Sequence, residues 1–222
     1  MVVSLITHTP EPEKVIASAA KLCYSSSDIE TLMNGLTSEK IEKFIKKLTD
    51  LGHQSPLEHC SFTFGIEGIS RACSHQLVRH RLASYSQKSQ RYVKEGGFEY
   101  IKPKTIKDES NLSVAYDLLM SRIQKFYDMA IENGIPAEDA RFVLPNACET
   151  KIIMTMNIRS LLHFFEERCC NRAQWEIRRI ADEMLNICKE VAPNIFAKAG
   201  ASCVRGKCKE GKMCCGNPKG GN

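Results

Sequence analysis

The chain has 222 residues, of which 43% are hydrophobic, and its formal net charge is +5 at pH 7. This length allows a sizeable buried core and fits one domain better than two. The charge is far below that of a dedicated nucleic-acid-binding protein, and no apolar run approaches the roughly 18 residues of a membrane span. We therefore expect a globular protein with neither a nucleic-acid nor a membrane partner. Its short apolar opening lacks a basic lead and a cleavage site, which predicts a cytoplasmic location.

Hydrophobic periodicity predicts a mixture of helices and short strands without an internal repeat. Apolar residues at helical spacing, with their caps, indicate the helices, and strict alternation indicates the strands. The elements expected in the first 67 residues are a strand at 2–8, a helix at 13–23, a polar loop at 24–36, a helix capped by Thr37 or Ser38 and stopped by Gly52, a polar turn at 52–59 and a strand at 60–67.

The polar turn at 52–59 is rich in hydrogen-bonding groups and stands directly before a strand, a place where ligands are often bound. His53, His59 and Cys60 are possible metal ligands, but their spacing matches no familiar zinc pattern. Polar caps on a connecting loop are the other interpretation of these residues.

A basic stretch follows, because residues 68–94 contain six Lys and Arg residues and no Asp or Glu. Arginine matches phosphate and carboxylate groups with two parallel hydrogen bonds, and the interleaved Ser and Gln side chains add neutral ones. The stretch therefore predicts a binding site for a small anionic ligand, although a solvated basic helix face is the plainer interpretation.

Helical spacing from residue 69 places Gln76, Arg79 and His80 on one face, with Arg81 well off it. The cluster can surround a ligand only if the backbone leaves the helix soon after His80. We therefore expect an ordered loop at residues 83–90.

The second half of the chain is predicted to be largely helical. The expected elements are a strand at 98–102, a helix at 112–133 with Ala115, Leu118, Leu119, Ile123, Phe126, Ala130 and Ile131 facing inward, a short helix at 137–143, a strand at 151–156, a helix from 159 capped by Asn157, and a helix at 175–191 ended by Pro193.

Eleven cysteines are present, an odd number, and no secretory signal accompanies them, so most are expected to be reduced. Five of them stand among apolar neighbours and are expected to be buried: Cys23, Cys60, Cys73, Cys148 and Cys188.

Residues 199–222 form a tail rich in Gly, Lys and Cys, which predicts a flexible appendage to a domain at 1–198. Its thiols, Cys203, Cys208, Cys214 and Cys215, are consistent with a zinc site, with redox lability or with disorder.

The basic stretch resembles the signature of flavin-dependent thymidylate synthases, an Arg-His-Arg followed by seven residues and a Ser, here Arg79 to Ser89 and continuing to Arg91. Three distant segments, 52–59, 140–145 and 157–168, resemble the family's pattern in the same order. The resemblance covers residues 1 to about 198.

The resemblance implies an α+β fold in which a central, largely antiparallel sheet is flanked by helices, assembled as a homotetramer with shared active sites. It implies that dUMP is converted to dTMP, with 5,10-methylenetetrahydrofolate as the one-carbon donor and NADPH reducing the FAD. No Gly-rich dinucleotide loop is present.

The resemblance also implies roles for individual residues. The positions that match flavin contacts are His53, Ser55, Arg79, His80, Arg81, Asn157, Ile158, Arg159 and His163. The positions that match dUMP contacts are Gln76, Leu77, Val78, Arg79, Gln87, Lys88, Ser89, Gln90, Arg91, Arg141 and Arg168.

Arg168 is the expected catalytic residue, since the family places an Arg beside the uracil ring, where a fixed cation would favour the electron-rich pyrimidine. The resemblance implies no cysteine nucleophile, and the ligand spacings lead us to expect no metal. Many relatives have Asn and Glu at Ser86 and Gln87, and Asn is common at His163.

From the residues without the resemblance, other interpretations remain. Arg141 is flanked by apolar residues, and an Arg in this setting is more often part of a structural ion pair than a ligand clamp. A nucleic-acid-binding protein and a zinc-linked interaction protein are the rival classes.

Overall fold

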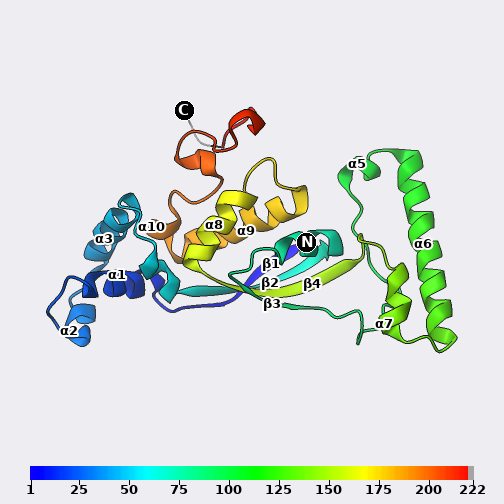
Figure 1. The fold of residues 1–222 in the computed structure, drawn as a ribbon, viewed down its shortest axis with the longest axis horizontal. Coiled ribbons are helices and arrows are strands. Elements are labelled where there is room, and N and C mark those ends of the chain that lie inside the picture. The colour runs from blue at the N-terminus through cyan, green and yellow to red at the C-terminus, as the bar shows by residue number, and fades with distance from the viewer. Residues whose placement is uncertain (220–222) are drawn as a thin grey trace. The chain divides into compact units, whose positions relative to one another are not determined.

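The computed structural model describes residues 1–219 and is a mixed structure of helices and one antiparallel sheet (Figure 1), which confirms the expected α+β class. The sheet has the strand order β1-β2-β4-β3. Unit 1 comprises residues 1–2, 66–79 and 85–153, and unit 2 comprises residues 3–65, 80–84 and 154 onward. The strands are β1 (Val2–His8), β2 (Ser61–Ser70), β3 (Ser84–Gln87) and β4 (Glu149–Asn157).

Unit 2 is built around aromatic side chains. The Phe196 ring packs edge-on against Phe62 and Phe165, with centroid distances of 6.0 Å in both pairs. Phe62 and Phe64 are buried because alternate residues of β2 point to one face. The helical elements of unit 2 are α1 (Pro12–Leu22), α2 (Ile29–Asn34), α3 (Ser38–Asp50), η1 (Ser55–His59), α8 (Ile158–Arg168), α9 (Trp175–Val191), α10 (Pro193–Phe196), η3 (Ser202–Arg205) and η4 (Gly211–Met213).

Unit 1 has a smaller core, in which Phe98, Met120 and Cys148 are buried together. Tyr127 is also buried, and its hydroxyl accepts a hydrogen bond from the Glu95 N–H at 3.1 Å. The helical elements of unit 1 are α4 (Arg71–Leu77), α5 (Lys104–Lys107), α6 (Ser110–Glu132), α7 (Ala137–Ala140) and η2 (Arg141–Val143).

Most predicted elements are confirmed, but three segments differ. The expected loop at 24–36 contains α2, a short helix that has one buried residue and is capped by Asp28, whose carboxylate accepts from the Thr31 N–H at 2.8 Å. The expected strand at 98–102 is reduced to a bridge between Tyr100 and Cys148. The expected loop at 83–90 contains β3, because a polar edge strand gains its stability from backbone pairing more than from burial. The prediction that Cys23 is buried is also wrong, since its side chain is exposed.

The chain leaves the helix three residues earlier than expected. Helix α4 is capped by Ser70, whose hydroxyl accepts from the Cys73 N–H at 3.0 Å, and it ends at Leu77. The Tyr85 hydroxyl donates to the Leu77 carbonyl at 2.9 Å, which satisfies an acceptor at the helix end. The expected change from helix to non-helical chain near His80 is therefore confirmed.

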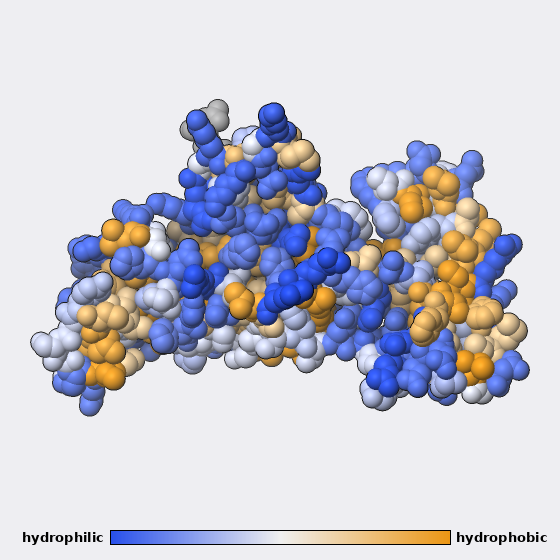
Figure 2. All heavy atoms as spheres, in the orientation of Figure 1, coloured by the Kyte–Doolittle hydropathy of each residue, from blue (hydrophilic) through white to orange (hydrophobic). Residues whose placement is uncertain are grey.

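Helix α6 presents an apolar face that the described chain leaves uncovered. Leu118, Leu119 and Phe126 were expected to face inward, yet they are 59%, 52% and 51% exposed, whereas Met120 and Tyr127 are buried. Figure 2 shows hydrophobic side chains gathered over α6. Helix α6 therefore carries more apolar surface than unit 1 buries.

No helix within residues 1–219 is both long enough and apolar enough to span a membrane. The predicted tail ends in residues 220–222, which lie outside the described residues.

Candidate active site

Helix α8 positions the predicted catalytic residue. Asn157 begins the helix, because its side-chain oxygen accepts from the Ser160 N–H at 2.8 Å. Three turns later, at the last residue of α8, Arg168 Nε donates to His80 Nε2 at 2.9 Å. Two residues that lie 88 positions apart in the sequence are therefore in direct contact in unit 2.

His80 is held in its neutral form by its surroundings. Burial, the Arg168 cation and His163 together lower the pKa of His80 from 6.5 to about 4. Its ring packs edge-on against Phe164 at 5.0 Å and lies 6.0 Å from the His163 ring. A neutral imidazole can accept the Arg168 N–H, so the contact fixes the direction of the guanidinium without neutralising its charge.

The lowered pKa of His80 predicts acid sensitivity. An unfolded histidine titrates near 6.5, so unfolding takes up a proton at this residue between about pH 4 and 6.5. Stability is therefore expected to fall as the pH drops through this window. The free energy of unfolding of wild type should fall more steeply from pH 7 to pH 5 than that of His80→Gln, measured with urea. Equal slopes would contradict a neutral, folded-state His80.

The other residues assigned to flavin in unit 2 are mostly at the surface. His53, Ser55, Arg81, Arg159 and His163 are exposed. Arg159 forms an ion pair with Glu58 at 2.5 Å, with 50% of its side chain exposed. The Ile158 side chain is buried, and its N–H donates to the Cys60 carbonyl, so a ligand contact would have to come from its carbonyl group.

Residues 87–91 form the predicted substrate segment, and their amide side chains tie it into unit 1. Gln87 Nε2 donates to the Ser74 hydroxyl at 2.8 Å and to the Thr150 hydroxyl at 3.2 Å. Gln90 is buried, and its Nε2 donates to Cys148 Sγ at 3.4 Å. A glutamate at position 87 could not donate these two hydrogen bonds, so both contacts depend on the amide of Gln87.

Lys88 is also turned toward the protein. Its ammonium group donates to Glu95 Oε2 at 2.8 Å, and the two side chains are 21% and 6% exposed. Burial would lower the pKa of Lys88, but the hydrogen bond and charge of Glu95 raise it above its ordinary value. This pair, with Gln87 and Gln90, holds the substrate segment in place.

Arg91 and Arg141 meet at Glu138. Arg91 donates from Nε at 3.1 Å, and its NH2 lies 3.0 Å from the same oxygen, Glu138 Oε2. Arg141 Nε donates to the Glu138 backbone carbonyl at 3.1 Å. Two residues that were predicted to contact dUMP, from separate segments, are thus brought to one residue of α7.

The remaining residues assigned to dUMP lie around helix α4 in unit 1. Leu77 is buried, Gln76 is half-buried, and Val78 and Arg79 are exposed. Arg79 Nε donates to the His75 carbonyl at 3.4 Å. Ser89 Oγ accepts from the Arg91 N–H at 3.3 Å.

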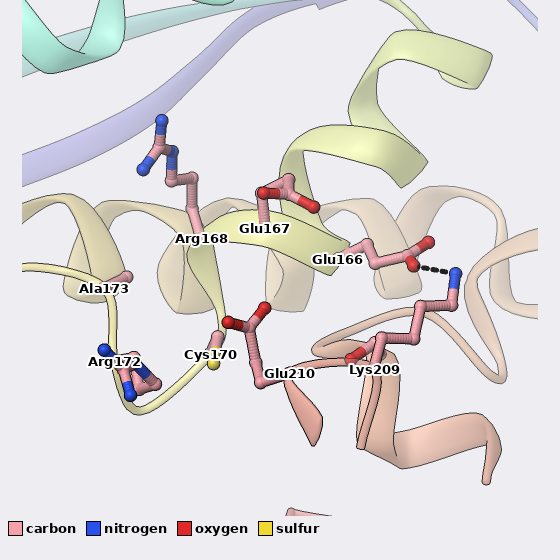
Figure 3. Close-up of a pocket in the computed structure, with 9 residues that line it drawn as sticks. Glu166, Glu167, Arg168, Cys170, Arg172, Ala173, Lys209 and Glu210 are labelled. Atoms are coloured by element: carbon pink, nitrogen blue, oxygen red, sulfur yellow. Dashed lines mark hydrogen bonds and ion pairs between the residues drawn. The ribbon is translucent and has the colours of Figure 1, made fainter. Parts of the chain in front are cut away.

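A hollow of about 130 Å³ lies beside the end of α8 and is lined by Arg168, Cys170, Arg172 and residues of the tail. Figure 3 shows Glu166 turned toward Lys209, with the Arg168 side chain pointing away from both. Glu166 also pairs with Arg205 at 2.7 Å, so the tail is tied to α8. Within residues 1–219, no group of three or more His, Cys, Asp or Glu side chains is arranged to hold a metal ion.

Sequence reasoning missed the acidic partners of the basic residues. Glu58, Glu95 and Glu138 each pair with a residue that was assigned to a ligand. One signal in the sequence could have indicated an acidic partner, because Glu95 is the first acidic residue after the acid-free stretch. The position of Glu138, three residues before Arg141, was a weaker one.

Comparison with known proteins identifies relatives over nearly the whole chain. Residues 4–194 match the family model described as thymidylate synthase complementing protein. A flavin-dependent thymidylate synthase of Clostridium tetani is 53% identical over 96% of this chain and 92% of its own length. Those of Geobacter sulfurreducens and Pyrococcus horikoshii are 54% and 43% identical, over 97% and 95% of this chain and 94% and 90% of their own lengths.

The match to the Clostridium tetani protein covers 96% of this chain. The uncovered 4% is a shorter stretch than the tail, so the match must extend into residues 199–222. The family model covers residues 4–194, which include the substrate segment and helix α8. On both grounds, this chain belongs to the flavin-dependent thymidylate synthase family.

Proposed function

We propose that this chain is a flavin-dependent thymidylate synthase that makes dTMP from dUMP, with 5,10-methylenetetrahydrofolate as the one-carbon donor and NADPH reducing the FAD. The observation that carries the proposal is the identity of 53–54%, over almost the full length, with two relatives named flavin-dependent thymidylate synthase. The basic residues described above agree with it in their chemistry, because the nucleotide and the cofactor are both anionic.

For dUMP, we propose that Ser89, Arg91 and Arg141 bind the phosphate. Phosphate monoesters carry close to two negative charges, and guanidinium groups bind them with paired, charge-assisted hydrogen bonds. The anchored backbone of the substrate segment supports this role, because it presents Ser89 and Arg91 from a fixed strand end. Gln87, Lys88 and Gln90 would then act mainly through the position of this segment.

The donor set of unit 2 fits a flavin dinucleotide. Arg81 and Arg159 are exposed guanidinium groups and His163 is an exposed imidazole, which together suit a pyrophosphate. The flavin, when bound, would supply reversible transfer of reducing equivalents. The residues of unit 2 proposed to hold it are His53, Ser55, His80, Arg81, Asn157, Ile158, Arg159 and His163.

For activation of the pyrimidine, we propose Arg168. Its Nε is occupied by His80, which leaves the terminal N–H groups of the guanidinium for the uracil ring. A cation in a fixed direction stabilises negative charge that develops on the ring and so makes C5 a better nucleophile. No thiol of the enzyme is required in this scheme.

We also propose that the enzyme is a cytoplasmic homotetramer. The exposed apolar side chains of α6 support association, since an uncovered hydrophobic face of this kind is typical of an interface. A native mass of four chains in solution is the corresponding measurement.

The central test is an anaerobic assay. Purified protein loaded with FAD should be yellow, its flavin spectrum should shift when dUMP is added, and it should form dTMP when methylenetetrahydrofolate and NADPH are supplied. Omitting each component in turn is the control. Protein that cannot be loaded with FAD, or that forms no dTMP under these conditions, would contradict the proposal.

A further inference from the structure

The contact between Arg91 and Glu138 places a carboxylate where a phosphate is expected to bind. Arg91 uses Nε and NH2 on one oxygen of Glu138, at 3.1 Å and 3.0 Å. Arg141 is held by the backbone carbonyl of the same residue at 3.1 Å. Both guanidinium groups are therefore gathered around Glu138.

This ion pair is suited to exchange. Both side chains are 50% exposed, so the pair is solvated and can open without leaving a buried charge. Glu138 offers one negative charge through a single oxygen, whereas a phosphate monoester offers close to two charges and three oxygens. A phosphate is accordingly the stronger partner for an arginine fork.

We infer that Glu138 is an intramolecular substitute for the substrate phosphate, which holds Arg91 in the free enzyme and is displaced when dUMP binds. The inference rests on the proposed function, because it assumes that Arg91 is a phosphate ligand of dUMP. Glu138 thus sets the affinity of the site, since every incoming anion must first compete with it. The competition lowers the affinity of every anion that needs Arg91 by the same factor, so only an intrinsically strong ligand such as a dianionic phosphate still binds well.

The test compares dUMP binding to wild type and to Glu138→Gln, both as FAD-loaded enzyme. The dissociation constant for dUMP is expected to fall about two- to fivefold in Glu138→Gln, which is the range an exposed ion pair contributes. The dissociation constant for inorganic phosphate should fall by the same factor. The affinity for deoxyuridine, which lacks the phosphate, should not change. Glu138→Ala removes the same carboxylate and should behave like Glu138→Gln.

Asp108→Asn is the matched control, because it removes one negative charge from an exposed ion pair in the same unit and should leave dUMP binding unchanged. If wild type binds dUMP and neither Glu138 variant binds it more tightly, the inference is overturned while the proposed function stands. An equal gain for deoxyuridine, or for Asp108→Asn, would also overturn it. If wild type binds no dUMP, the proposed function itself has failed.

Discussion

Replacing Arg168 by lysine is expected to lower kcat for dTMP formation about 100- to 1000-fold while dUMP still binds. The guanidinium is oriented by the 2.9 Å bond from its Nε to His80, and a lysine has neither this N–H nor the planar fork. Positive charge alone is therefore not expected to restore activity. The rate of dTMP formation at saturating dUMP, measured beside the dissociation constant for dUMP, separates lost activation from lost binding.

Arg172→Lys is a matched control, because Arg172 is exposed and lines the same hollow as Arg168. Its kcat should stay within about twofold of wild type, as for most surface substitutions. Turnover of Arg168→Lys at the wild-type rate would show that the direction of the cation is unimportant and would contradict the proposed role.

Glu95→Ala is expected to lower the free energy of unfolding by about 3 kcal/mol. The substitution leaves the ammonium group of Lys88, whose side chain is 21% exposed, without the carboxylate that stabilises its charge. It also loosens the substrate segment, so the KM for dUMP should rise. Urea unfolding followed by circular dichroism measures the first effect, and steady-state kinetics measures the second.

Two comparisons make this prediction specific. Glu39→Ala breaks an ion pair whose side chains are both 75% exposed and should cost less than about 1 kcal/mol. The double variant Lys88→Met/Glu95→Leu should be close to wild type in stability, because Glu95 Oε1 is buried without a hydrogen-bond partner among residues 1–219 and the pair is incompletely satisfied. A double variant as unstable as Glu95→Ala would refute this explanation.

Local sequence patterns were sufficient for the elements with strong periodicity or clear caps. Helix α3 begins after Thr37, whose hydroxyl accepts from the Lys40 N–H, and the chain turns at Gly52 with a φ of 72°. Helix α9 buries Ile177, Ile180 and Met184 as expected. Short or polar elements were missed, since α2 has one buried residue and β3 depends on pairing with β4.

Periodicity also predicted too much burial. The spacing of Leu118, Leu119 and Phe126 indicates an apolar face of α6, but a pattern does not specify which molecule covers it. In the described chain these side chains are exposed, so the face is available to another copy of the chain.

The residue types of the basic stretch and their spacing were enough to indicate an anion site and its family. The tertiary structure decided which of these side chains contact one another. His80 meets Arg168, Lys88 meets Glu95 and Arg91 meets Glu138, at separations of 88, 7 and 47 residues. Such pairs leave no periodic trace in the sequence, because they depend on where the fold brings the chain together.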